Sequence, residues 1–79
     1  MALLISVTPA GEGWSVRSDV LDGPLAFARG ARAEQAARAL ASRYADAGHS
    51  AEVQVFLKDG AMAGRFLHPA RGQSTLLAG

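Results

Sequence analysis

Only one segment of the chain, residues 32–47 (RAEQAARALASRYADA), has the periodicity of an α-helix. The segments before and after it alternate between apolar and polar residues, as strands do. One helix can cover only one face of a sheet. The sequence therefore predicts an α+β domain: an antiparallel sheet of four to five strands, in the order β-β-(β)-α-β-β, with one helix packed on one face.

The helix is predicted from composition and spacing together. Its Ala, Leu, Arg and Glu content favours helix, and Glu34 and Arg38 are expected to form an i, i+4 ion pair. Gly48 is expected to end the helix, whereas residues 29–33 contain no Ser, Thr, Asp or Asn to cap its start. The expected apolar face comprises Ala33, Ala36, Ala37, Leu40, Tyr44 and Ala47.

A hairpin is predicted before the helix. Residues 2–8 alternate, and Pro9 is expected to end that strand. Residues 14–20 alternate again after a Pro- and Gly-rich turn, which predicts antiparallel pairing. Trp14 is in phase with Val16, so we expect it to be the largest core side chain. Residues 25–28 (LAFA) are interpreted as a short third strand.

A second hairpin is predicted after the helix, from residues 51–58 and 61–68. The dipeptide Asp59-Gly60 between them predicts a two-residue type I′ loop, which requires positive φ at both positions. Such a loop places Leu57 opposite Met62 and, further along, Ala51 opposite His68. The same register places Gln54 opposite Arg65, with Glu52 diagonal to it.

The sheet face that the helix leaves uncovered is expected to be less polar than a solvated face should be. We therefore expect a small, non-catalytic binding or assembly module, not an enzyme, that forms a homodimer through this face or through the sheet edges. Phe56 and Leu67 are expected as apolar anchors, with Arg65 at the rim. The expected interface residues are Phe56, Lys58, Arg65 and Leu67.

The alternative prediction is a nucleic-acid-associated module. Residues 29–43 contain four Arg and one Glu, a local net charge of +3, although the whole chain carries only +1. Binding to nucleic acid requires several cations on one face. The expected contacts would come from Arg32, Arg38 and Arg43, but Arg32 and Arg43 are expected on different sides of the helix.

The length of 79 residues allows one small domain, expected over residues 1–68, with a flexible tail over residues 69–79. No cofactor or metal is expected. The chain has no Cys, and Asp46, His49 and His68 are too few and too scattered to predict a metal site. The N-terminal apolar run is too short for a signal-peptide core or a membrane span, so we expect a soluble, cytoplasmic protein.

The order of these motifs resembles a small bacterial family known as domain of unknown function 2188. The resemblance covers roughly residues 3–68, and it implies the fold but no chemistry, because the family has no established activity. Its most specific parts are Trp14-Ser15-Val16, Ala33-Glu34-Gln35-Ala36-Ala37 and Lys58-Asp59-Gly60.

The chain departs from that family at several points. The family usually opens the helix with Thr, where this chain has Gly30-Ala31-Arg32. The loop over residues 20–24 and the segment 47–50 are longer than is typical. A Tyr-Gly near the family's C-terminus is replaced here by LHPARG.

Overall fold

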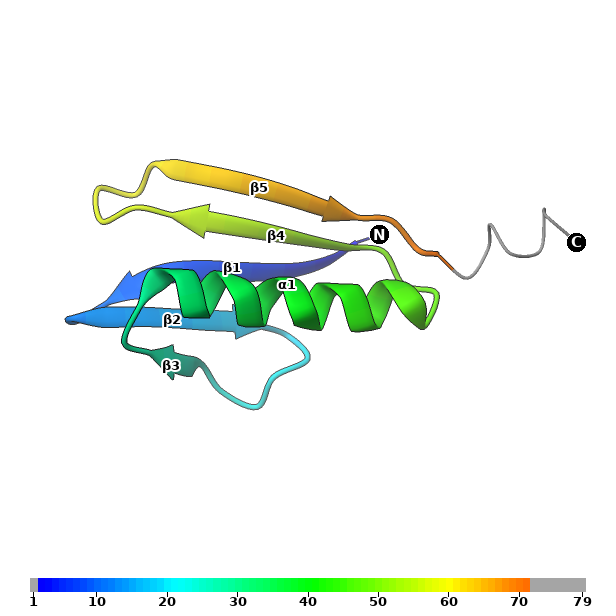
Figure 1. Cartoon of the computed structure of the whole chain (residues 1–79), viewed down its shortest axis with the longest axis horizontal. Helices are drawn as coiled ribbons and strands as arrows, with labels where there is room; N and C mark the ends of the chain where they lie inside the picture. Colours follow the sequence, from blue (N-terminus) through cyan, green and yellow to red (C-terminus); the bar gives the residue numbers. More distant parts are fainter. Residues whose placement is uncertain (1, 72–79) are drawn as a thin grey trace, which may run out of the picture.

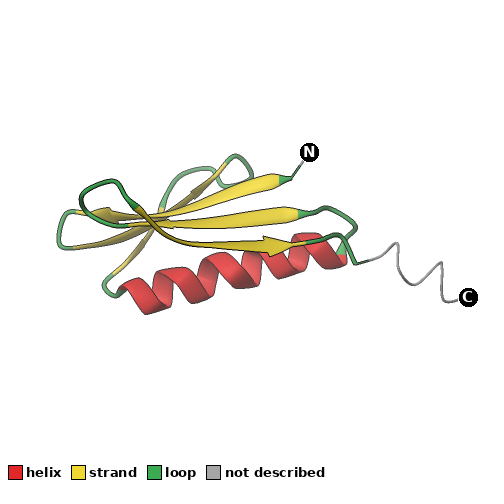
Figure 2. Ribbon diagram, turned by 90° about the horizontal axis from the view of Figure 1, so that it is seen from above, coloured by secondary structure: helices red, strands yellow, loops and turns green. Residues whose placement is uncertain are grey.

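The computed structural model describes residues 2–71, which form one sheet and one helix in two layers (Figures 1 and 2). The elements follow the predicted order, and the predicted α+β class is confirmed. The sheet has the strand order β3-β2-β1-β4-β5, and the helix α1 lies along one of its faces. The elements are β1 (Leu3–Ala10), β2 (Gly13–Ser18), β3 (Leu25–Phe27), α1 (Gly30–Asp46), β4 (Ala51–Phe56) and β5 (Met62–His68).

The sheet is mixed and not wholly antiparallel as predicted. β1 and β4 pair in parallel at its centre, with Leu3 opposite Ala51 and Val7 opposite Val55, whereas the other three pairings are antiparallel. Parallel neighbours need a long crossover connection. The chain between these two strands contains β2, β3 and α1, so it is long enough to bring β4 alongside β1 in the same direction.

The core lies between α1 and the sheet. Ile5 and Val7 of β1, Val16 of β2 and Val53 of β4 are fully buried side chains on the face toward the helix. Full burial of each such side chain contributes about 1.5–3 kcal/mol relative to exposure. Because residues alternate along a strand, the intervening positions of β1 and β4 point to the opposite face.

A stripe of alanines lets α1 lie close to this core. The fully buried helix residues are spaced four apart, and they are Ala33, Ala37, Ala41 and Ala45. The predicted face was only partly correct, because Ala47 is exposed and lies beyond the last helical residue, Asp46. The side chains of Leu40 and Tyr44 are half-buried at the border of the stripe and do not form its centre.

Both ends of α1 follow from the local sequence. Arg29 occupies the N-cap position without a side-chain hydrogen bond, as the lack of capping residues predicts. At the other end, the His49 backbone N–H donates to the Tyr44 carbonyl (2.8 Å) and that of Gly48 donates to the Ala45 carbonyl (3.1 Å). This pair of bonds is a Schellman motif, and it confirms Gly48 as the helix stop.

Trp14 packs beneath the first turn of α1. A Cβ atom on Gly30 would lie 2.8 Å from the Trp14 ring, so the absence of a side chain at Gly30 allows the indole to approach the helix. Trp14 is only partly buried and borders the core, whereas we expected it to be the largest core residue. Its position at the edge of the helix end accounts for this remaining exposure.

The first hairpin turns later than predicted. Pro9 does not end β1 but lies opposite Trp14, and the loop consists of Gly11 and Glu12 alone. Proline lacks a backbone N–H and is tolerated where no neighbouring strand requires one. The pairing of β1 with β4 extends only to Val7, so at Pro9 the strand has a neighbour on one side only.

The second hairpin contains two irregularities that the sequence analysis missed. Its loop has three residues, Lys58 to Gly60, because the Leu57 N–H donates to the Ala61 carbonyl (2.8 Å). Only Gly60 has positive φ (89°), so the predicted type I′ turn is wrong. The Asp59 carboxylate instead accepts a hydrogen bond from the Ala61 N–H (2.9 Å).

A bulge between Val55 and Phe56 then restores the predicted register. Phe56, and not Leu57, lies opposite Met62, so that part of the prediction is wrong. From Val55 to Ala51, however, every predicted pair is confirmed, down to Ala51 opposite His68. The extra loop residue shifts the pairing by one position, and the bulge shifts it back.

The chain beyond β5 contacts the end of α1. The Arg71 guanidinium pairs with the Asp46 carboxylate (2.7 Å) and donates to the Ser42 carbonyl and hydroxyl, while its backbone N–H donates to the Ala45 carbonyl. A cation at a helix C-terminus also interacts favourably with the helix dipole. The rest of the predicted tail, residues 72–79, lies outside the described residues.

Candidate functional site

The candidate site is the sheet face turned away from α1, which we call the open face. No element formed by residues 2–71 covers it (Figure 2). Its side chains come from all five strands, by the alternation that sends the core residues to the helix side. The open face comprises Leu4, Ser6, Thr8, Ser15, Arg17, Ala26, Glu52, Gln54, Phe56, Met62, Arg65 and Leu67.

Three rows of side chains cross the open face from strand to strand. The first row places Leu4, Glu52 and Leu67 side by side. The second is polar and consists of Arg17, Ser6, Gln54 and Arg65. The third contains Ala26, Ser15 and Thr8, followed across the sheet by Phe56 and Met62.

A carboxylate with three donor contacts organises the polar part of this face. Glu52 accepts two hydrogen bonds from the Arg65 guanidinium (2.7 and 3.2 Å) and one from the Gln54 amide (2.6 Å). The bonds from Arg65, and then the bond from Gln54, hold the pKa of Glu52 below its ordinary value. The predicted diagonal contact between Glu52 and Arg65 is thus confirmed, and its two hydrogen bonds join the two side chains.

Apolar side chains surround this polar cluster. The exposed fraction is 48% for Leu4, 48% for Met62 and 63% for Leu67, and Phe56 is half-buried. Leu4 and Leu67 flank Glu52 directly, since both are opposite it on the neighbouring strands. Met and aromatic side chains are enriched in protein interfaces, whose charged residues lie mainly at the rim.

The residues predicted as interface residues are only partly together. Phe56, Arg65 and Leu67 lie on the open face, on β4 and β5. Lys58 does not, because β4 ends at Phe56 and Lys58 belongs to the hairpin loop. Their role in an interface remains a prediction.

Sequence reasoning missed two members of the open face. Met62 was predicted on the helix side, and the bulge reverses its direction. Arg17 was given no role, although its alternation with the buried Val16 was already a signal that it points away from the core. Within residues 2–71, Arg17 is exposed and forms no ion pair.

Ser15 is a buried polar group on the same face. Its side chain is 5% exposed, and its hydroxyl has no hydrogen-bond partner within the described chain. It lies between Thr8 and Ala26 on the neighbouring strands. The small side chains at Ser15 and Ala26 leave this part of the face flat.

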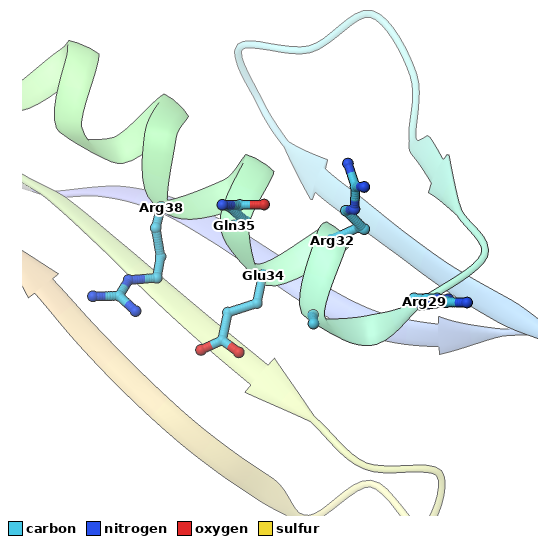
Figure 3. Close-up of a pocket in the computed structure, with 6 residues that line it drawn as sticks. Arg29, Arg32, Glu34, Gln35 and Arg38 are labelled. Atoms are coloured by element: carbon cyan, nitrogen blue, oxygen red, sulfur yellow. The ribbon is translucent and has the colours of Figure 1, made fainter.

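The basic residues predicted for nucleic-acid contact do not gather on one side of α1. Arg38 lies over the Phe66 ring, 4.5 Å from its centroid, and does not pair with Glu34 as predicted. Figure 3 shows Arg38 and Glu34 directed toward the β4–β5 side of a surface pocket, and Arg32 toward the β2–β3 side. This separation of Arg32 from Arg38 does not favour the nucleic-acid alternative.

Arg43 lies on the same side of the helix as Arg32, contrary to our prediction. The two are eleven residues apart on one continuous helix, which is about three full turns. Both are exposed. The outer side of α1 thus carries these two cations, and Arg38 is directed elsewhere.

The part of the chain that the structure describes offers no other candidate centre. Among residues 2–71, no group of three or more His, Asp or Glu side chains is placed to hold a metal ion. The same residues contain no helix with the length and apolar character of a membrane span.

The chain matches no protein-family model, and comparisons with curated proteins and with solved structures found no match either. The resemblance to domain of unknown function 2188 therefore remains a prediction. The functional argument depends on the open face alone.

Proposed function

We propose that this chain is a small, non-catalytic binding and assembly module that forms a homodimer through its open face. The observation that carries the proposal is a five-stranded sheet with a helix on one face only within residues 2–71. An uncovered sheet face with several exposed apolar side chains is typical of an interaction surface.

The size of the domain supports the same proposal. A domain of this length buries a smaller fraction of its surface on folding, roughly 60–65%, than a larger domain does. Four aliphatic side chains and an alanine stripe form most of its core. Self-association is a common way for such domains to gain buried apolar area. The open face supplies that area without any change in the fold.

The test is the mass of the protein in solution before and after a charge is placed on the open face. The unmodified chain is expected to change from 8.2 kDa to twice that mass as its concentration rises. Phe56→Lys is expected to abolish this change, because it would bury an unpaired charge in the interface.

A matched control uses an apolar residue on the other side of the sheet. Leu25 is more exposed than Phe56, but it pairs with Val16 and therefore lies on the helix side. Leu25→Lys is expected to leave the dimer intact. A protein that stays at the monomer mass up to high micromolar concentration would show that the proposal is wrong.

A further inference from the structure

The open face has two unlike halves, one on each side of β1. β2 and β3 lie on one side of this central strand, and β4 and β5 lie on the other. In the row through Thr8, the β2–β3 half carries the small side chains Ser15 and Ala26, whereas the β4–β5 half carries the large side chains Phe56 and Met62. Phe56 continues this row because β1 and β4 are in register up to the preceding position.

The charges of the two halves also differ. In the row through Ser6, the β2 side carries the exposed cation Arg17. The β4–β5 side carries Gln54 in the same row, beside Glu52, which holds Arg65. The Gln54 amide nitrogen donates to Glu52, and its carbonyl oxygen remains as an acceptor. The cation Arg17 on one half can therefore meet an acceptor, the Gln54 carbonyl oxygen, on the other half.

From this asymmetry we infer that a second copy of the chain packs on the open face about a two-fold axis that runs along β1. The inference rests on the proposed homodimer and specifies its geometry. Rotation about β1 places the β2–β3 half of one copy over the β4–β5 half of the other. Thus β2 of each copy lies over β4 of the other, and β3 lies over β5. Packed sheets of this kind keep their strands nearly aligned.

This arrangement joins unlike halves in the rows through Thr8 and Ser6. Phe56 lies over Ser15 of the second copy, and Met62 lies over Ala26 of the second copy, so large side chains meet small ones. Arg17 lies over Gln54 of the second copy, next to Glu52. Each contact occurs twice because the interface is symmetric.

The other two-fold axis in the plane of the face, perpendicular to the strands, fits less well. It would place each strand over the same strand of the second copy, with the two strands running in opposite directions. With that axis at the level of the Ser6 row, Arg17 would face Arg17 of the second copy, and Arg65 would face Arg65. Like charges brought together in an interface oppose association, which disfavours this perpendicular axis.

The open face offers a large part of the area that a stable dimer needs. Five strands about 4.8 Å apart, with about six residues rising about 3.3 Å each, cover a plane of about 24 Å by about 20 Å. Side chains increase the accessible area above that of the plane. Stable interfaces bury about 800 Å² per partner. The area buried by covering the whole open face approaches this value, whereas the area buried by a contact along one edge strand does not.

Cross-linking between single cysteines tests the axis. The chain has no native Cys, so each engineered thiol is the sole reactive one. A short bis-maleimide would span the separation of about 10 Å between packed sheets. Thr8→Cys lies on the proposed axis and is expected to give a covalent dimer with itself. Arg17→Cys is expected to cross-link only when mixed with Gln54→Cys.

Three results would overturn this arrangement in a protein that sediments as a dimer. The first is self-cross-linking of Arg17→Cys without that of Thr8→Cys, which indicates the perpendicular axis. The second is self-cross-linking of Leu67→Cys alone, which indicates pairing at the β5 edge. The third is the absence of any cross-link from these positions. A protein that sediments as a monomer would instead refute the proposed homodimer itself.

A charge exchange provides a second test that needs no cross-linker. Arg17→Glu and Gln54→Lys are each expected to weaken the dimer at least tenfold, the first by removing the cation and the second by opposing it. Together they are expected to restore the affinity, because the two new charges face each other across the interface. Additive losses in the double variant would contradict the contact between Arg17 and Gln54 of the second copy.

Discussion

At the residue scale, the second hairpin depends on a single backbone conformation. Gly60 has φ of 89°, and its N–H donates to the Leu57 carbonyl (3.0 Å) to close the loop. Residues with a Cβ rarely adopt this conformation. Asp59-Gly60 therefore did indicate a tight turn from sequence. The dipeptide does not reveal how many residues the loop contains, because Asp is compatible with φ of either sign.

Gly60→Ala is expected to destabilise the protein by about 1 kcal/mol, because alanine would be forced into the left-handed region. The measurement is thermal or urea unfolding. Gly23→Ala is the matched control, since Gly23 has ordinary φ and open space around its Cβ position. Equal stabilities for the two variants would show that the positive φ at Gly60 is not required.

Glu52 makes the stability depend on pH. Its pKa is lowered in the folded protein by the hydrogen bonds from Arg65 and Gln54, so the folded state favours the carboxylate. The resulting stabilisation is complete well above the ordinary value of 4.5 and is lost as the pH falls through the lowered pKa. Glu52→Gln is expected to be less stable than the unmodified protein at neutral pH, with a difference that shrinks on acidification. A difference that stays constant from pH 7 to pH 3 in urea unfolding would contradict this account.

At the element scale, α1 shows what periodicity can and cannot establish. Its existence, its uncapped start and its stop at Gly48 were all predictable, because they depend on composition and local hydrogen bonding. The orientation of the helix on the sheet was not. Apolar residues lie all around the middle of the segment, and the sheet selects the Ala33–Ala45 stripe because small side chains permit the closest approach.

Ala41→Leu is expected to destabilise the protein by about 1–3 kcal/mol, because Ala41 is fully buried against the sheet and has no room for a larger side chain. Ala39→Leu is the control on the exposed side of the same helix turn, where the change should lie within about 0.5 kcal/mol. The measurement is chemical unfolding. A similar, small effect of both substitutions would show that the stripe is not tightly packed.

Most of the register of the β4–β5 hairpin was predicted correctly although two features were missed. The extra loop residue and the bulge shift the pairing in opposite directions, so their effects cancel. The alternation of Val53 and Val55 with polar residues fixes the face of β4, and this constraint does not depend on the loop. A bulge has no clear sequence signal apart from a small residue, here Ala63, which the pairing skips between Gly64 and Met62. The prediction therefore failed only between the bulge and the loop, where Met62 changes face.

At the scale of the whole molecule, the element order was predictable but the strand order was not. Local patterns reveal hairpins, because neighbouring segments pair across short loops. The parallel contact between β1 and β4 joins residues about 48 positions apart, such as Leu3 and Ala51, and leaves no mark in the local pattern. The open face was nevertheless predictable, since one helix cannot cover both faces of a sheet.

The unequal halves of the open face appear only once the strand order is known. Ser15 and Phe56 are far apart in sequence, and their relation across β1 follows from the placement of β2 and β4 on its two sides. Arg17 and Gln54 lie in one row for the same reason. The proposed pairing of these residues between two copies therefore depends on the strand order.

The central claim is that the open face is buried by a second copy of the chain. Sedimentation equilibrium of the unmodified protein over a range from low to high micromolar concentration tests it most directly. A reversible shift from 8.2 kDa to twice that mass is expected. A single species of 8.2 kDa at every concentration would contradict it.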